Sequence, residues 1–175
     1  LSRARSLCTS ASSARARIAV VGCGGWTQGW HLPNLANRAD AEIAALVDSS
    51  DTPGVGGCVP SLCVPMEELS AKYNAPRYAS LEDALADASL QIDGVLVAVP
   101  HAHHCAIGTA ALTAGKHVLM EKPMAADVTD ARALLSLALA RPEQAFLLNN
   151  TANWQPGSIA AFEAVSRGEI GEIKH

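Results

Sequence analysis

The amino-acid sequence predicts an α/β fold in which helices cover both faces of a doubly wound parallel sheet. Short apolar runs alternate with segments of helical periodicity from residue 17 almost to the end of the chain. The runs are continuous rather than alternating, and "DGVLVAVP" (93–100) is the clearest of them. Strands that are buried on both faces of a parallel sheet show this pattern. The alternation of such strands with helices therefore predicts a two-sided sheet.

The predicted elements follow one another in a regular order. Strands are expected at 17–22, 41–48, 93–100, 117–120 and 145–149. Helices are expected after the first strand, with Pro33 in the early part, and at 66–73, 80–88, 104–114, 127–140 and 158–167. Ser80 and Asp83 have the spacing of a helix N-cap pair, and Gly115 stands where a helix C-cap belongs. Residues 51–65 contain glycine, proline and cysteine without periodicity, which predicts an irregular segment.

Composition excludes several classes of protein. The chain has 175 residues, 49% of them hydrophobic, and a net charge of −4. This length suits one domain of ordinary size, or one domain plus a piece of another. An acidic chain gives no reason to expect nucleic acid as a partner. No apolar run approaches the roughly 18 residues that a membrane span needs. The five cysteines are scattered and odd in number, which is typical of a reducing compartment, so we expect a cytoplasmic location.

The first residues predict a separate segment. Residues 1–16 are rich in arginine and serine and contain no acid. We expect them to form either a disordered tail or an organelle transit segment. A transit segment would place the protein in an organelle matrix or stroma instead of the cytoplasm.

A glycine-rich turn follows the first predicted strand. Gly22, Gly24 and Thr27 occupy the three slots of the G-x-G-x-x-G fingerprint, with Gly25 and Trp26 between the last two. The first glycine allows a tight turn, the second lets the backbone approach a pyrophosphate, and the helix behind them presents free N–H groups. Thr27 departs from the third glycine, whose function is close packing of helix on strand. The turn predicts a dinucleotide site at residues 22–27.

An acid supports this interpretation. The second predicted strand ends on Asp48, roughly 20 residues beyond the turn, where a carboxylate can accept hydrogen bonds from the adenosine ribose. Asp48 favours NAD over NADP because a 2′-phosphate would meet its charge. Ser49 and Ser50 could accept a phosphate, so both NAD and NADP stay open. S-adenosylmethionine on the same fold is a further alternative.

Three segments carry a family resemblance. "IAVVGCGG" near the start, "VAVPHAHHCAIGTAALTAGKHVLMEKPMA" in the middle and "NNTANWQPGSIAAFEAVSRGEIGEI" at the end resemble the Gfo/Idh/MocA oxidoreductases. These are NAD(P)-dependent enzymes that act mainly on sugars, inositols and related polyols. The resemblance implies a Rossmann-type dinucleotide-binding domain over 17–150. It further implies that 151–175 begin a second substrate domain, an α+β unit with an antiparallel sheet, which is truncated here.

The resemblance also assigns roles in the second half of the chain. It implies that Val99 and Pro100 line the nicotinamide half of the cleft and that His104 occupies the family's later histidine slot. Glu121 and Lys122 match the family's Glu-Lys-Pro, whose lysine contacts the nicotinamide ribose and substrate hydroxyls. Lys122 is therefore the candidate catalytic residue. The catalytic Asp/His pair would belong to the second domain, so we expect this chain alone to be inactive.

The histidine-rich segment 101–104 departs from the family pattern. The family usually shows Thr-Pro-Asn where this chain has Val-Pro-His, which leaves the cofactor contacts at Val99 and His101 open. Three histidines within four residues also suggest a metal site. The family match accounts for their position without metal, so no metal is expected. His31 and His117 are expected to be structural.

The predicted function is hydride transfer between a nicotinamide cofactor and a sugar or inositol-type polyol, in a protein expected to be a homo-oligomer. The alternative is a non-catalytic, dinucleotide-sensing regulator of the same fold. The retained Glu-Lys-Pro favours the enzyme, because a sensor has less need of Lys122.

Overall fold

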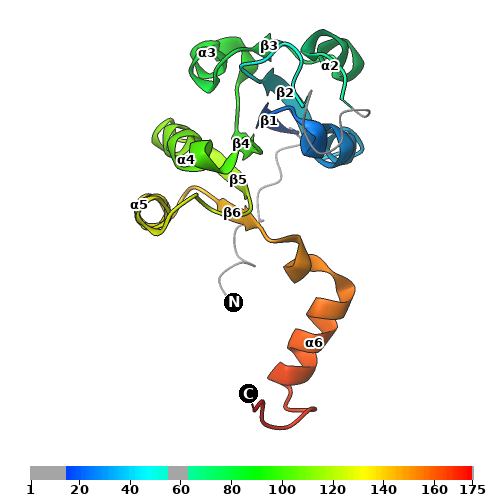
Figure 1. Ribbon diagram of the computed structural model, residues 1–175, viewed down its shortest axis with the longest axis vertical. Coiled ribbons are helices and arrows are strands. Elements are labelled where there is room, and N and C mark those ends of the chain that lie inside the picture. The colour runs from blue at the N-terminus through cyan, green and yellow to red at the C-terminus, as the bar shows by residue number, and fades with distance from the viewer. Residues whose placement is uncertain (1–14, 55–62, 175) are drawn as a thin grey trace.

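The computed structural model describes residues 15–54 and 63–174, and its centre is a parallel sheet (Figure 1). Six strands pair in the order β3-β2-β1-β4-β5-β6, and each pair is parallel. The strands are β1 (Ala16–Val21), β2 (Ala41–Val47), β3 (Arg77–Tyr78), β4 (Gly94–Val97), β5 (His117–Glu121) and β6 (Phe146–Asn149). Because the order reverses between β1 and β4, their carboxyl ends form the switch point where such sheets bind ligands.

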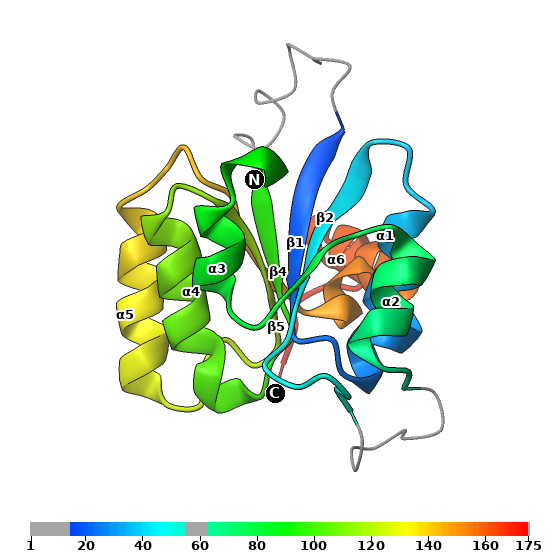
Figure 2. The ribbon, with the colours of Figure 1, turned by 90° about the horizontal axis from the view of Figure 1, so that it is seen from above.

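Helices lie on both sides of the sheet. Figure 2 shows α3 (Leu81–Ala86), α4 (His104–Thr113) and α5 (Val128–Leu139) on one face, and α1 (Leu32–Ala36) and α2 (Met66–Tyr73) on the other. Shorter helical turns are η1 (Thr27–His31), η3 (Ala88–Leu90), η4 (His101–His103) and η5 (Thr151–Trp154). The predicted doubly wound α/β fold is confirmed.

Side chains of β1 supply both halves of the core. Ala19 and Val21 point into a cluster with α3, α4 and α5, whereas Val20 belongs to a second cluster with α1 and α2. The helix residues of the first cluster include Leu81, Leu112 and Leu134, and those of the second include Leu32, Met66 and Leu69. This two-sided burial is the physical reason why the strands are apolar without alternation.

The ends of the helices agree with the sequence. The Ser80 hydroxyl accepts a hydrogen bond from the Asp83 N–H at 3.1 Å and caps α3. Asp127 caps α5 in the same way, through the Asp130 N–H at 2.9 Å. Gly115 follows α4 with a φ of +77°, a conformation that favours glycine at a helix C-terminus.

Three elements differ from the prediction. The edge strand β3 was not expected, because a strand of two residues is too short to show a periodic pattern. It pairs with the end of β2 through the Asp48 N–H, which donates to the Tyr78 carbonyl at 3.1 Å. The strand predicted at 93–100 ends at Val97, so residues 98–100 continue beyond the sheet edge. The helix after the glycine turn contains the π-helical turn η1. The predicted tail, 1–16, lies largely outside the described residues, as does 55–62 of the irregular segment.

The helix α6 (Pro156–Ser166) projects away from the sheet (Figure 1). Several of its apolar side chains and their neighbours are exposed, namely Trp154, Ile159, Phe162 and Val165. That residues 151–175 start a second domain stays a prediction. Within 15–54 and 63–174, no helix has the length and apolarity to cross a membrane.

We predict that Leu134→Ala lowers the free energy of unfolding by about 2–5 kcal/mol, because the side chain is fully buried and its loss leaves a cavity. Leu135→Ala on the same helix is the matched control, because Leu135 is exposed and should cost less than about 1 kcal/mol. Urea denaturation followed by circular dichroism measures both. Equal losses for the two variants would contradict the packing described for α5.

Candidate functional site

The glycine turn brings β1 against the end of β4. Gly22 has a φ of +88°, and a Cβ atom there would lie 2.5 Å from the Ala98 carbonyl oxygen. Its N–H donates to the Val47 carbonyl at 2.8 Å. A side chain at Gly22 would clash with backbone that cannot move without opening the sheet, so only glycine fits this position.

The second glycine faces open space. A Cβ at Gly24 would meet no atom of the described structure within 4 Å, and the helical backbone begins at Gly25. Thr27, in the third slot, is fully buried, and its hydroxyl donates to the Gly22 carbonyl at 2.5 Å. The threonine thus closes the turn from inside and leaves the outer face of the backbone accessible. This arrangement has room for a pyrophosphate next to the helix N-terminus.

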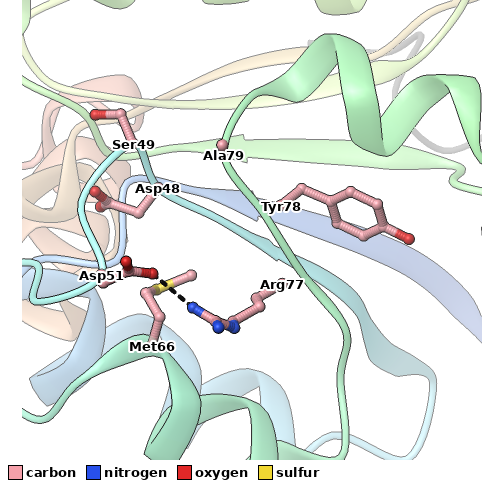
Figure 3. A pocket seen from close by; sticks show the side chains of 7 residues that line it. All are labelled: Asp48, Ser49, Asp51, Met66, Arg77, Tyr78 and Ala79. Carbon is pink, nitrogen blue, oxygen red and sulfur yellow. Dashed lines mark hydrogen bonds and ion pairs between the residues drawn. The ribbon is translucent and has the colours of Figure 1, made fainter.

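Asp48 ties the end of β2 to the glycine turn. One carboxylate oxygen accepts from the Cys23 N–H at 2.8 Å and the other from the Ser50 N–H at 2.9 Å. Burial, followed by the charge of Asp48, raises the pKa of the Cys23 thiol to about 12, so this cysteine stays neutral. Asp48 also borders a pocket of about 350 Å³ at the ends of β2 and β3 (Figure 3). The other lining residues are Ser49, Asp51, Met66, Arg77, Tyr78 and Ala79.

Glu121, the last residue of β5, accepts hydrogen bonds from the helix that follows the glycine turn, from β6 and from the next residue in the chain. Its Oε1 accepts from Trp26 Nε1 at 3.0 Å, His31 Nε2 at 2.9 Å and Asn149 Nδ2 at 2.7 Å. Its Oε2 accepts from the Lys122 N–H at 3.1 Å. The side chain is almost entirely buried. Glu121 was expected among the cofactor-binding residues, and the structure directs its carboxylate to groups of the protein itself.

The hydrogen bonds keep Glu121 ionised. Burial alone would raise the pKa of this carboxyl, but the bonds from Asn149, Trp26, the Lys122 N–H and His31 outweigh it and lower the pKa below its ordinary value. An ionised carboxylate only accepts, so His31 donates from Nε2. The site therefore contains a fixed negative charge between the glycine turn and β6.

Lys122 is placed at the carboxyl edge of the sheet. Its backbone is held by Glu121, and its side chain is exposed. Within the described residues the Lys122 ammonium makes neither a hydrogen bond nor an ion pair. A cation held at this edge without a protein partner is available to a ligand. Trp26, half-exposed at the same edge, lies against Trp30 with ring centroids 5.7 Å apart.

His104, which was expected among the cofactor-binding residues, is enclosed by the protein in this structure. Its ring is fully buried, with Nδ1 at 2.7 Å from the Pro123 carbonyl and Nε2 at 2.9 Å from the Val99 carbonyl. Because both nitrogens face backbone oxygens, the ring cannot be presented to a cofactor in this conformation. His104 instead holds Val99 and Pro100 against the segment that follows Lys122. Val99 is half-buried and Pro100 exposed at the same edge.

The sequence did not place His31 and Asn149 at this site. His31 was expected to be structural, and its contact with Glu121 is structural. Asn149 was expected only as the end of a strand. The parallel register pairs Glu121 directly with Asn149. Aligning the ends of the two predicted strands could therefore have indicated that Asn149 lies next to Glu121. His31 falls one helical turn beyond Trp26 and could be found only once the helix was oriented. His117 has a structural contact, in which Nδ1 accepts from the Ala145 N–H at 2.9 Å.

The histidine-rich segment does not gather metal ligands. His101 stacks edge-on against His104 with ring centroids 5.5 Å apart. Within the described ranges, no group of three or more histidine, cysteine, aspartate or glutamate side chains could hold a metal ion.

The fold and the glycine turn define a dinucleotide-binding domain of the Rossmann type. The family model described as "Oxidoreductase family, NAD-binding Rossmann fold" matches residues 16–148. The chain therefore belongs to the Gfo/Idh/MocA oxidoreductase family.

Two similar proteins are named as dehydrogenases. The chain is 34% identical over 109 residues to a D-xylose 1-dehydrogenase (NADP(+)) of Hypocrea jecorina, covering 62% of this chain and 27% of that one. It is 32% identical over 112 residues to a trans-1,2-dihydrobenzene-1,2-diol dehydrogenase of Danio rerio, covering 62% and 32%. The chain thus spans about a third of the length of these relatives.

Solved structures share the fold. The scyllo-inositol dehydrogenase from Lactobacillus casei, solved with NAD(H) and scyllo-inositol, superposes with a TM-score of 0.77 at 22% identity, covering 91% of this chain and 43% of that one. An NAD-binding oxidoreductase from Klebsiella pneumoniae gives a TM-score of 0.71 at 25% identity, covering 91% and 40%.

We predict that Glu121→Gln lowers the free energy of unfolding by about 1–3 kcal/mol at pH 7, because four N–H donors lose a charged acceptor. The folded-state pKa of Glu121 is depressed, so its contribution is present above the unfolded pKa and is lost as the pH falls through the folded pKa. The difference between wild type and variant should therefore shrink in acid.

Urea denaturation at several pH values between neutrality and about pH 3 measures this difference, within the range where Glu titrates. Glu82→Gln is the control, because Glu82 is exposed on α3 and should show little effect at any pH. A Glu121→Gln cost that did not change with pH would argue against an ionised Glu121.

Proposed function

We propose that this chain is the NAD(P)-binding part of a dehydrogenase that transfers a hydride between the cofactor and a sugar or inositol-type polyol. The observation that carries the proposal is Lys122, whose ammonium is exposed at the sheet edge and whose backbone N–H is held by Glu121. A lysine at this edge can hydrogen-bond the hydroxyl of a substrate whose carbon exchanges the hydride.

The residues present fit a dinucleotide. Gly24 opens backbone N–H groups to a pyrophosphate, and Gly22 lets the turn pass close to β4. Asp48 stands beside the turn with a carboxylate that can accept from ribose hydroxyls. When bound, the nicotinamide cofactor supplies or accepts the hydride. Asp48 favours NAD over NADP, because a 2′-phosphate would be repelled by its charge.

The names of the relatives support the substrate class. D-Xylose, a dihydrobenzene diol and scyllo-inositol, named for three similar proteins, all carry two or more hydroxyl groups. Because those proteins are two to four times longer than the matched segment, we propose that further substrate-binding residues lie outside this chain. Assembly into a homo-oligomer belongs to the same proposal.

The cofactor site is tested by Gly24→Asp. A carboxylate placed in the open space at Gly24 should repel a pyrophosphate and weaken NADH binding by about tenfold or more, whereas the fold has room for it. Gly157→Asp is the matched control, because Gly157 in α6 is equally open and lies outside the site. Titration with NADH, followed by nicotinamide fluorescence, measures the affinity. If both variants bind NADH as the wild type does, the proposed phosphate site is wrong.

Turnover distinguishes the enzyme from a dinucleotide-sensing regulator. In the longest form of the gene product, Lys122→Ala should lower turnover of the preferred polyol by about 10²–10⁴-fold, with a much smaller loss in NADH affinity. Lys116→Ala is the control, because Lys116 precedes β5 at the opposite end of the strand. A wild type that binds NADH but oxidises or reduces none of the polyols tested would favour the regulator. Val99 and His101, which stand where the family usually has threonine and asparagine, are the sequence feature that favours the regulator.

A further inference from the structure

Among the described residues that line the pocket next to Asp48, Arg77 is the one cationic side chain, and it forms an ion pair with Asp51. Arg77 Nη1 lies 2.6 Å from Asp51 Oδ1. Figure 3 shows Arg77 reaching across the pocket from β3 to Asp51, with Asp48 on the same side as Asp51. The Tyr78 ring points away from the pocket, and its hydroxyl donates to Asp87 at 2.7 Å. The charges that face a ligand here are thus two carboxylates and one guanidinium.

The two carboxylates are held differently. Both oxygens of Asp48 are engaged by backbone N–H groups, so its position is fixed. The Asp51 side chain is 88% exposed, and within the described part of the chain Arg77 is its partner. The backbone of Asp51 is anchored independently, because its carbonyl accepts from the Met66 N–H at 2.9 Å. A change of the Asp51 side chain should therefore alter the charge of the pocket without moving the loop.

We infer that Asp51 is a specificity-determining residue, which selects NAD by keeping the Arg77 guanidinium engaged. The inference rests on the proposed function, in which Asp48 marks the adenosine ribose. A 2′-phosphate carries up to two negative charges, and a free guanidinium would bind it bidentately. With Arg77 paired to Asp51, the pocket keeps a net negative charge and accepts a ribose hydroxyl instead. NADP is thus excluded by two means, repulsion from Asp48 and occupation of Arg77.

A single substitution can remove the ion pair between Arg77 and Asp51. Both partners are substantially exposed, at 49% and 88% of their side chains, and exposed ion pairs contribute little to stability. Losing the Asp51 carboxylate should therefore release Arg77 without unfolding the chain. The guanidinium would then be available at the position where the 2′-phosphate of NADP is expected.

The test compares NADH and NADPH binding to the wild type and to Asp51→Asn, by nicotinamide fluorescence at low ionic strength. The variant should raise the affinity for NADPH relative to NADH by about tenfold. In the double variant Asp51→Asn/Arg77→Ala the gain should disappear, because the released cation is gone. Glu67→Gln is the matched control, since it removes one exposed negative charge from the first turn of α2, and it should change the ratio by less than about twofold.

The outcomes separate the inference from the proposed function. If the wild type binds NADH and Asp51→Asn leaves the ratio unchanged, Asp51 does not control specificity and the inference is overturned, while the cofactor site stands. If Glu67→Gln produces the same gain as Asp51→Asn, general charge and not the ion pair sets the ratio, which also overturns it. If the wild type binds neither cofactor, the proposed function falls and the inference with it. A thermal melt monitored by circular dichroism confirms that each variant is folded.

Discussion

The carboxylate of Glu121 is the interaction on which the site depends. Burial of a charge is costly unless hydrogen bonds replace the water that it loses, and here four N–H groups do so. They come from the helix behind the glycine turn, from β6 and from the backbone of Lys122. Because these donors meet on one side chain, the glycine turn, the strand edge and the lysine are fixed relative to one another.

A second carboxylate completes this arrangement. Asp48 bonds the Cys23 N–H inside the glycine turn, and Glu121 bonds Trp26 just after the turn. The turn is therefore held from β2 on one side and from β5 on the other, with β1 and β4 between them. An order of strands that reverses at β1 and β4 is what places both acids within reach.

Features that depend on neighbouring residues in the chain could be predicted from the sequence. Apolar runs located five of the six strands, and the capping pair at Ser80 and the glycine at 115 placed the ends of helices. Roles that depend on packing were not predictable. His104 sits in a motif slot that suggests cofactor contact, and only its complete burial between two carbonyls shows that it positions backbone. The Asp51–Arg77 pair joins an irregular segment to a two-residue strand, neither of which has a periodic pattern.

The two ends of the site have separate physical requirements. Lys122 depends on a buried carboxylate and on backbone geometry at β5, where a substitution disturbs packing and hydrogen bonding together. The Asp51–Arg77 pair lies at β2 and β3, on the far side of the glycine turn, and both side chains are exposed. In the proposed function a dinucleotide would span these regions, with its nicotinamide near Lys122 and its adenosine near Asp48. Under that proposal, cofactor selectivity depends on exposed charges at β2 and β3, while the carboxylate of Glu121 that holds the Lys122 backbone is fixed by buried hydrogen bonds.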